Sequence, residues 1–453
     1  MSISSEALVA HVYRRLGFGP APGDVQAGVD AGGASAVVDQ LLAAPTTTVD
    51  DWQWPADQGV WQDAIAWMNR LFANWAHSPG QMQERVSWML AGLLVVGAND
   101  TVQYADYKDH HMRLRNWRTA GSYQALLADV AASGPMQKYL TGIFSVPPHA
   151  NENLAREIME LFSLGVTHPK TGADNYTEAD IKEIARALTG YRMDWNTLAV
   201  SFDPAYWDSG NKTFLGAARG AAKLADVVNA IASQDSFKYF VPKRIYREFM
   251  GFDPSSAAMD EMAAVWGSTG DMAGLVSHIV HRPEFLAEST VNNRVKSPVE
   301  LFVSQMKVLG VQNIDDWSIF WVTQVMRQNP VLPPDVSGWG DLWLHPTQIV
   351  MWARMNYWYT WHDQGPDKDG TADATPPEKQ NPTVRKLYAE ATRATAADMA
   401  LQLAGLHDVS PQTRGAIDAY AKAYDYGAAE PWSYARACGV MQMVFDSPEF
   451  QVA

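Results

Sequence analysis

The sequence predicts a mostly α-helical protein that forms one large globular body or two fused helical lobes. Apolar residues recur at helical spacing through most of the 453 residues. Neither a β-hairpin signal nor a series of alternating strands interrupts this pattern. Hydrophobic residues make up 47% of the chain and charged residues 19%, a balance typical of globular proteins. No apolar run of about eighteen residues occurs, so we expect no membrane span.

The first third of the chain contains several predicted helical segments. A helix that begins at residue 5 should end at the Gly-Phe-Gly-Pro turn of residues 17–20, because glycine and proline do not continue a helix. The later segments are 33–44, then 61–96 with a break at Ser78-Pro79-Gly80, and 115–140 with a break at Gly134-Pro135.

Residues 150–191 are predicted to form two amphipathic helices joined by a loop. Asn151 is expected to cap the first helix by accepting a free backbone N–H, and Gly165 is expected to end it in the left-handed conformation. Thr177 should cap the second helix, with Asp180 at the second position of a capping box. This pair forms the centre of the predicted main body.

The remainder of the chain predicts an irregular segment at 192–220, a second series of helices and one linker. The linker, 364–382, is rich in proline, glycine and charged residues. We therefore expect a main helical body over 1–363 and C-terminal helices over 383–453 that pack on it. The predicted helices are 222–232, 236–250, 256–267, 270–281, 298–309, 316–328, 347–363 (after a Pro-rich turn at 330–346), 383–406, 410–424 and 432–446.

Five polar residues of the first central helix fall within one arc of about 140°. They are Glu152, Asn153, Arg156, Glu157 and Glu160. One interpretation is a solvated face with i, i+4 ion pairs that each contribute a few tenths of a kcal/mol. The other is one wall of a polar cleft, in which clustered carboxylates raise one another's pKa for acid–base chemistry. The spacing alone is compatible with both.

The order of these residues closely resembles the central motif of the bacterial domain-of-unknown-function 1800 family. The matching positions are Asn151 to Asn153, Arg156, Glu157, Glu160 to Phe162, Leu164, Gly165, Tyr176, Thr177 and Ala185 to Gly190. Further matches occur at Arg14 to Pro20, Lys212 to Gly216, Lys296 to Pro298, Pro333 to Trp339 and Ser447 to Gln451. The resemblance implies one family along nearly the whole chain, but no particular activity.

The chain departs from the family where the family carries histidines. Two histidines of a Phe-Trp-His-Asn-His-Phe segment correspond to Ala91 and Leu93, and a third corresponds to Trp207. We therefore predict no bound metal and no cofactor. A rebuilt site around Asp106 and His110, four residues apart on one helix face, is the alternative to a solvated helix start at that place.

Charge and cysteine content exclude several classes of protein. A formal net charge of −15 argues against a nucleic-acid partner. The single cysteine, Cys438, excludes an internal disulfide and a Cys-rich zinc site. The N-terminal residues lack the basic and then apolar order of a signal peptide, so we expect a cytoplasmic protein, although the family resemblance suggests that many members are exported.

Two hypotheses for function follow. In the first, the chain is an enzyme acting on a glycan or another polyhydroxylated ligand, with Glu157 and Glu160 as an acid–base pair beside Arg156. Several of the 18 tryptophans have polar neighbours in the sequence. These tryptophans could face sugar rings or simply pack in the core. The expected ligand-binding residues are Asn153, Asp335, Trp339, Arg354 and Trp207. In the second hypothesis, the chain is a non-catalytic helical binding or partner protein, and the central charges form a structural ion-pair network.

Overall fold

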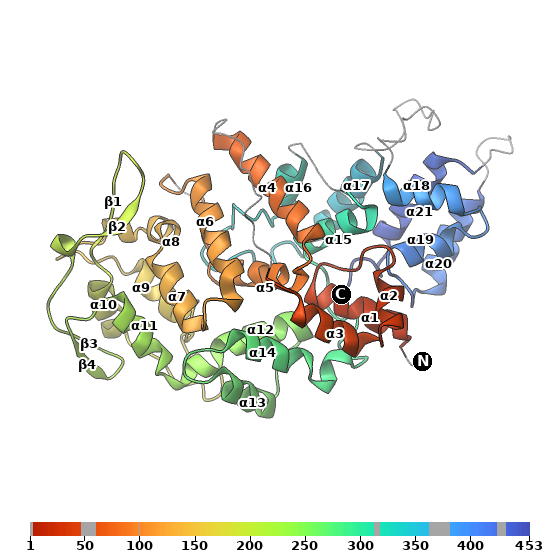
Figure 1. Cartoon of the computed structure of the whole chain (residues 1–453). Helices are drawn as coiled ribbons and strands as arrows, with labels where there is room; N and C mark the ends of the chain where they lie inside the picture. The colour runs from red at the N-terminus through yellow and green to blue at the C-terminus, as the bar shows by residue number, and fades with distance from the viewer. Residues whose placement is uncertain (1–2, 47–59, 99, 312–317, 362–380, 424–431) are drawn as a thin grey trace.

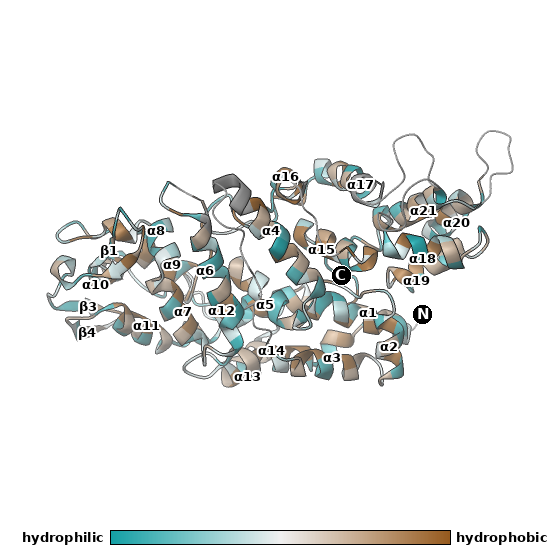
Figure 2. Ribbon diagram, turned by 45° about the horizontal axis from the view of Figure 1, so that its top comes forward, coloured by the Kyte–Doolittle hydropathy of each residue, from teal (hydrophilic) through white to brown (hydrophobic). Residues whose placement is uncertain are grey.

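A computed structural model describes residues 3–46, 60–98, 100–311, 318–361, 381–423 and 432–453. These residues form 21 α-helices and two small two-stranded antiparallel sheets, which confirms the predicted mostly α-helical class. Figure 2 shows that individual helices carry both apolar and polar residues, as expected for amphipathic helices that share a core. The expected linker at 364–382 lies almost entirely outside the described residues.

The N-terminal half is built from ten helices. They are α1 (Ser5–Leu16), α2 (Asp24–Asp30), α3 (Ala34–Ala43), α4 (Val60–His77), α5 (Gln81–Ala91), α6 (Tyr104–Arg115), α7 (Tyr123–Ala132), α8 (Gly134–Tyr139), α9 (Asn153–Glu160) and α10 (Glu178–Ala187). The predicted breaks at 78–80 and near 134 are present. The short helix α2 was not predicted.

The irregular segment after α10 contains two hairpins that no sequence pattern indicated. Strand β1 (Tyr191–Met193) pairs with β2 (Val200–Phe202), and β3 (Lys212–Phe214) pairs with β4 (Ala217–Gly220). Strands of three or four residues are too short to show an alternating pattern. Strand β3 packs against α10 and therefore holds this segment beside the central helices.

The C-terminal half contains eleven helices. They are α11 (Leu224–Ala232), α12 (Phe240–Met250), α13 (Ser256–Trp266), α14 (Met272–Val280), α15 (Pro298–Leu309), α16 (Ser318–Val325), α17 (Pro346–Trp361), α18 (Pro382–Glu390), α19 (Ala396–Leu403), α20 (Pro411–Lys422) and α21 (Tyr434–Asp446). The predicted single helix over 383–406 is two helices, α18 and α19. Helix α21 packs against α17, α18, α19 and α20, and α18 also contacts α15.

Aromatic side chains build the middle of the core. Trp75 of α4 is fully buried, and its ring lies 5.1 Å from that of Trp88 on α5, centroid to centroid. Phe72 and Phe18 contact the same indole at 5.2 and 5.6 Å. Large aromatic surfaces give the largest burial energies per residue, so many of the tryptophans serve packing.

The two ends of the chain meet. Arg15 of α1 is fully buried, and its Nη2 donates hydrogen bonds to the carbonyl oxygens of Thr290 (3.0 Å) and Ala453 (2.8 Å). The Ala453 N–H donates to the Arg294 carbonyl at 2.8 Å. Figure 1 shows the C-terminus beside α1, so the last residues close the region around the first helix.

A glycine of the family motif is held by both its conformation and its surroundings. Gly165 has φ +78°, and a Cβ at this position would lie 2.7 Å from the ring of Phe240 on α12. Gly172 has a similar φ of +72°, but a Cβ there would meet nothing within 4 Å. The two glycines therefore separate backbone strain from steric contact.

We expect Gly165→Ala to reduce the free energy of unfolding by about 2–4 kcal/mol, because left-handed strain and overpacking add. Gly172→Ala should cost only about 1 kcal/mol, the strain alone. Urea unfolding followed by circular dichroism measures both. Equal losses in the two variants would show that the Phe240 ring moves aside freely.

Candidate functional site

The polar stripe of α9 is divided between two environments, and Arg156 organises the first. Its guanidinium lies 3.3 Å from Glu152 Oε2 and 3.3 Å from Glu160 Oε1 on the same helix. It also donates to both carboxylate oxygens of Glu178 on α10, at 3.0 and 2.9 Å. These side chains are partly exposed. Arg156 therefore links the two central helices through an ion-pair network at the surface.

Glu157 lies in the second environment and is only partly exposed. Burial raises its pKa to about 7, and the negative charges of Glu160 and Asp335 act in the same direction. The nearby Arg156 cation opposes this effect but does not cancel it. A carboxyl group with this pKa is partly protonated at neutral pH, so it can both donate and accept a proton.

The turn that carries Asp335 approaches Glu157 from a distant part of the sequence. Burial raises the pKa of Tyr139 to about 12, and the negative charges of Asp335 and Glu157 act in the same direction. The Asp335 carboxylate accepts hydrogen bonds from the backbone N–H (2.7 Å) and the hydroxyl of Ser337. The turn is thus held by its own side chains, with Asp335 exposed.

The asparagines of the central motif position the start of α9. Asn151 lies two residues before the helix, and its Oδ1 accepts the Asn153 N–H at 2.9 Å. Both side-chain amides donate to the hydroxyl of Thr141, at 2.7 Å from Asn151 and 3.3 Å from Asn153. Gly165 has the expected left-handed conformation, with φ +78°, but α9 already ends at Glu160 and a turn separates the two. Asn153 nevertheless remains exposed beside the polar stripe.

Of two further expected ligand-binding residues, Trp339 belongs to the aromatic core and Arg354 lies on a helix far from α9. Trp339 is buried, its Nε1 donates to the Asn329 carbonyl at 2.9 Å, and its ring lies 4.8 Å from that of Trp88. Arg354 is exposed on α17, and Figures 1 and 2 both show α17 far from α9. Trp339 still lines a cavity, which is described below.

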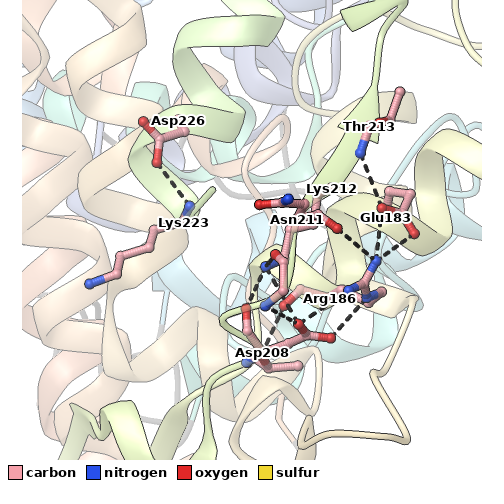
Figure 3. Close-up of polar contacts among 10 residues, drawn as sticks. Glu183, Arg186, Asp208, Asn211, Lys212, Thr213, Lys223 and Asp226 are labelled. Atoms are coloured by element: carbon pink, nitrogen blue, oxygen red, sulfur yellow. Dashed lines mark hydrogen bonds and ion pairs between the residues drawn. The ribbon is translucent and has the colours of Figure 1, made fainter. Parts of the chain in front are cut away.

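A separate polar cluster joins the loop before β3 to α10 (Figure 3), and Trp207 contacts this cluster through Lys212. Arg186 Nε donates to Asp208 Oδ2 at 2.8 Å, and its Nη1 donates to both oxygens of Glu183 at 2.8 and 2.9 Å. Lys212 is buried and donates to the carbonyls of Asp208 and of Gly210, the latter at 2.9 Å. Lys212 also lies under the indole of Trp207, 5.1 Å from its centroid. These family positions therefore form structural contacts in this chain.

One of the two expectations for the segment from Asp106 to His111, a solvated helix start, was wrong. Asp106, His110 and His111 are all buried, because α6 packs against α5 and α8. Asp106 caps α6 by accepting the Gln103 N–H at 2.6 Å, and both of its oxygens lie 2.9 Å from Lys138 Nζ. Burial lowers the pKa of His110 to about 4, so its imidazole is neutral at pH 7.

No group of three or more His, Cys, Asp or Glu residues in the described ranges is arranged to hold a metal ion. Ala91 lines a cavity of about 20 Å³ with His110 and His111, whereas the ring of Trp207 lies against Lys212. We expect protein purified without added metal to contain far less than one equivalent of zinc, iron or copper by elemental analysis. A stoichiometric metal would contradict this and would point to His110 and His111.

A buried arginine cluster was missed by the sequence analysis. Arg294 donates to both oxygens of Glu300, at 2.9 Å for the longer bond, and Arg85 Nη2 lies 2.8 Å from Glu300 Oε1. Glu300 and Arg85 are buried inside helices α15 and α5. Although burial alone would raise the pKa of Glu300, these two guanidinium groups hold it well below the usual range. Charged residues flanking the Lys296-Ser297-Pro298 motif were the available signal.

Within the described ranges, every helix is too short or too polar to cross a lipid bilayer. Comparison of the chain with curated proteins and with solved structures gave no match. A family model described as "Protein of unknown function (DUF1800)" matches residues 11–452. That match covers the central helices, the Trp207 cluster and the turn that carries Asp335. The chain therefore belongs to the DUF1800 family.

Proposed function

We propose that this protein is an enzyme acting on a glycan or another polyhydroxylated ligand, with Glu157 as the general acid–base group. The observation that carries the proposal is the pKa of Glu157, which burial and the charges of Glu160 and Asp335 raise to about 7. A general acid or base is most effective when its pKa is close to the working pH.

The surroundings of Glu157 contain candidates for the other groups that hydrolysis of a glycosidic bond needs. Asp335 is exposed and accepts hydrogen bonds from Ser337, and it is a candidate for the second carboxylate that glycosidases use. Glu160 is less suited to that role because Arg156 holds it in the surface network. The exposed amide of Asn153 could bind a hydroxyl group beside them.

A screen of oligosaccharides for hydrolysis and binding, run with Glu157→Gln, tests this proposal. Gln keeps the shape but cannot transfer the proton, so we expect turnover to fall by about 10²–10⁴-fold. Glu152→Gln is the matched control, since Glu152 lies on the same helix and contacts Arg156 at 3.3 Å. Its turnover should stay within about threefold of the parent protein. Equal losses in both variants would contradict the assignment of Glu157.

The stability of Glu157→Gln gives a second and independent measurement. Because the pKa of Glu157 is raised in the folded protein, the native state loses stability as the pH rises from about 4.5 to about 7. Removing the charge should therefore stabilise the protein at pH 8, by ~1 kcal/mol after allowing for solvent screening, and not at pH 4. Thermal melts at the two pH values measure this. A loss of stability at pH 8 would show that Glu157 has a structural role.

The second candidate is a non-catalytic partner protein, and the Arg156 network favours it. Three carboxylates around one guanidinium join α9 to α10 without needing a ligand. If no oligosaccharide binds and Arg156→Gln lowers the melting temperature, the partner hypothesis is preferred. The cytoplasmic location expected from the N-terminal sequence stays a prediction.

A further inference from the structure

We propose that a cavity between α5, α12, α15 and residues 337–344 binds a small organic anion, through the guanidinium groups of Arg85, Arg244 and Arg294. The cavity has a volume of about 400 Å³, and these elements meet near the middle of the molecule (Figure 1). The ligand would carry a carboxylate or phosphate group. This site does not include Glu157, so the inference is independent of the function proposed above.

Two buried N–H groups at this cavity lack an acceptor in the described part of the protein. Arg85 is 1% exposed and lines the cavity, yet its Nε has no hydrogen-bond partner among the described residues. Arg294 also lines the cavity, and its buried Nε likewise has no hydrogen-bond partner among the described residues. A buried donor without an acceptor costs about 1–3 kcal/mol, and an oxyanion is the acceptor that a guanidinium binds best.

Three arginines and three carboxylates line the cavity, and the arginines are on the whole the more buried. Glu300 is the one buried carboxylate, whereas Glu248 and Asp341 are exposed. The Glu248 side chain is 49% exposed. Its Oε2 lies 3.7 Å from Arg85 Nη2, which is too far for a hydrogen bond. Because the whole chain carries a net charge of −15, an anion would be repelled from most of the surface. In this cavity the guanidinium groups are less exposed than two of the three carboxylates, so solvent screens their attraction for an anion less.

The walls of the cavity indicate the size and character of the ligand. A second cavity of about 400 Å³ shares Arg244, Glu248 and Arg294 with the first, so these residues lie where the two spaces meet. Trp339 and Trp343 line the first cavity and offer an apolar surface to the remainder of the ligand. Arg244 Nη1 donates to the Leu161 carbonyl at 3.1 Å, which fixes its position at the end of α9. A small molecule with one oxyanion group and a ring fits this arrangement.

Binding of inorganic phosphate and of glucuronate, measured by calorimetry on the full chain, tests the proposal, with glucose as the uncharged control. We expect at least one of the two anions to bind with one equivalent and glucose not to bind. Glucuronate alone would assign a carboxylate, and phosphate alone would assign a phosphate ester. Failure of both anions, or binding of glucose as tight as that of glucuronate, would overturn the proposal.

Variants on one helix locate the site. Arg244→Gln should weaken the anion by about tenfold or more, because a charge-assisted hydrogen bond is lost. Glu248→Gln removes a competing charge at a half-exposed position and should tighten binding by about threefold. Lys243→Gln is the control, since Lys243 is on the same helix but pairs with Asp253 at 3.1 Å. Equal affinities in Lys243→Gln, Arg244→Gln and Glu248→Gln would place any bound anion elsewhere and reject this site.

Discussion

Replacing Glu300 by Gln is expected to reduce the free energy of unfolding by about 3–5 kcal/mol. The change leaves Arg85 and Arg294 without the buried carboxylate that both contact, and Arg15 lies in the same field. Removing one member of a buried ion pair is costly because the remaining charge stays desolvated. Chemical unfolding monitored by circular dichroism and by tryptophan fluorescence measures the loss.

Glu248→Gln is the control for this prediction. It removes a carboxylate near the same guanidinium, but one that is half-exposed and 3.7 Å away. We expect its effect to stay below about 1 kcal/mol. If Glu300→Gln reduced the free energy of unfolding no more than Glu248→Gln does, water would reach the charged groups of this cluster in solution.

The effect of Glu300 also has a defined dependence on pH. Its pKa is depressed in the folded protein, so its contribution to stability is complete above its unfolded pKa of about 4.3 and is lost as the pH falls towards the lower folded value. The difference between the parent protein and Glu300→Gln should therefore shrink below about pH 4. A constant difference down to pH 3 would contradict a carboxylate that becomes protonated only on unfolding.

The second large effect is expected at the pair of Glu84 and Arg115, which joins α5 to α6. Arg115 Nε lies 3.0 Å from both oxygens of Glu84, and the two side chains are 1% and 0% exposed. Glu84→Gln should cost about 3–5 kcal/mol because the Arg115 charge loses its counter-ion in the core. Thermal melts together with urea titrations measure this loss.

An exposed pair of the same geometry is the matched control. Glu178 accepts two hydrogen bonds from Arg156, at 3.0 and 2.9 Å, but its side chain is 69% exposed. Glu178→Gln should therefore change the free energy of unfolding by less than about 1 kcal/mol. Similar losses in the two variants would mean that burial does not determine the strength of these pairs.

The features that the sequence predicted correctly depend on local chemistry. The capping box at Thr177 and Asp180 is present as expected, since its hydrogen bonds join residues three positions apart. The helix break at 78–80 is present because Pro79 has no backbone N–H to donate and disfavours the helical conformation of the residue before it. The family motif could also be recognised, because it is defined by the order of residues and needs no knowledge of their contacts.

The features that were missed depend on partners far away in the sequence. Asp106 and Lys138 pair across 32 residues, and the polar run around Asp106 gives no sign that α5 and α8 cover it. Arg85 pairs with Glu300, which lies on another helix more than two hundred residues further along the chain. Each charge by itself predicts an exposed position. Only the three-dimensional arrangement shows that charges of opposite sign are buried together.

The contact between Arg15 and Ala453 has a consequence for the synthesis of the protein. The two residues are 438 positions apart. At about 5–20 residues per second, on the order of a minute passes between the emergence of α1 from the ribosome and that of its last hydrogen-bond acceptor. Until then one acceptor of the buried Arg15 guanidinium is absent, so α1 cannot complete its native contacts. The nascent chain therefore needs protection from aggregation during the interval.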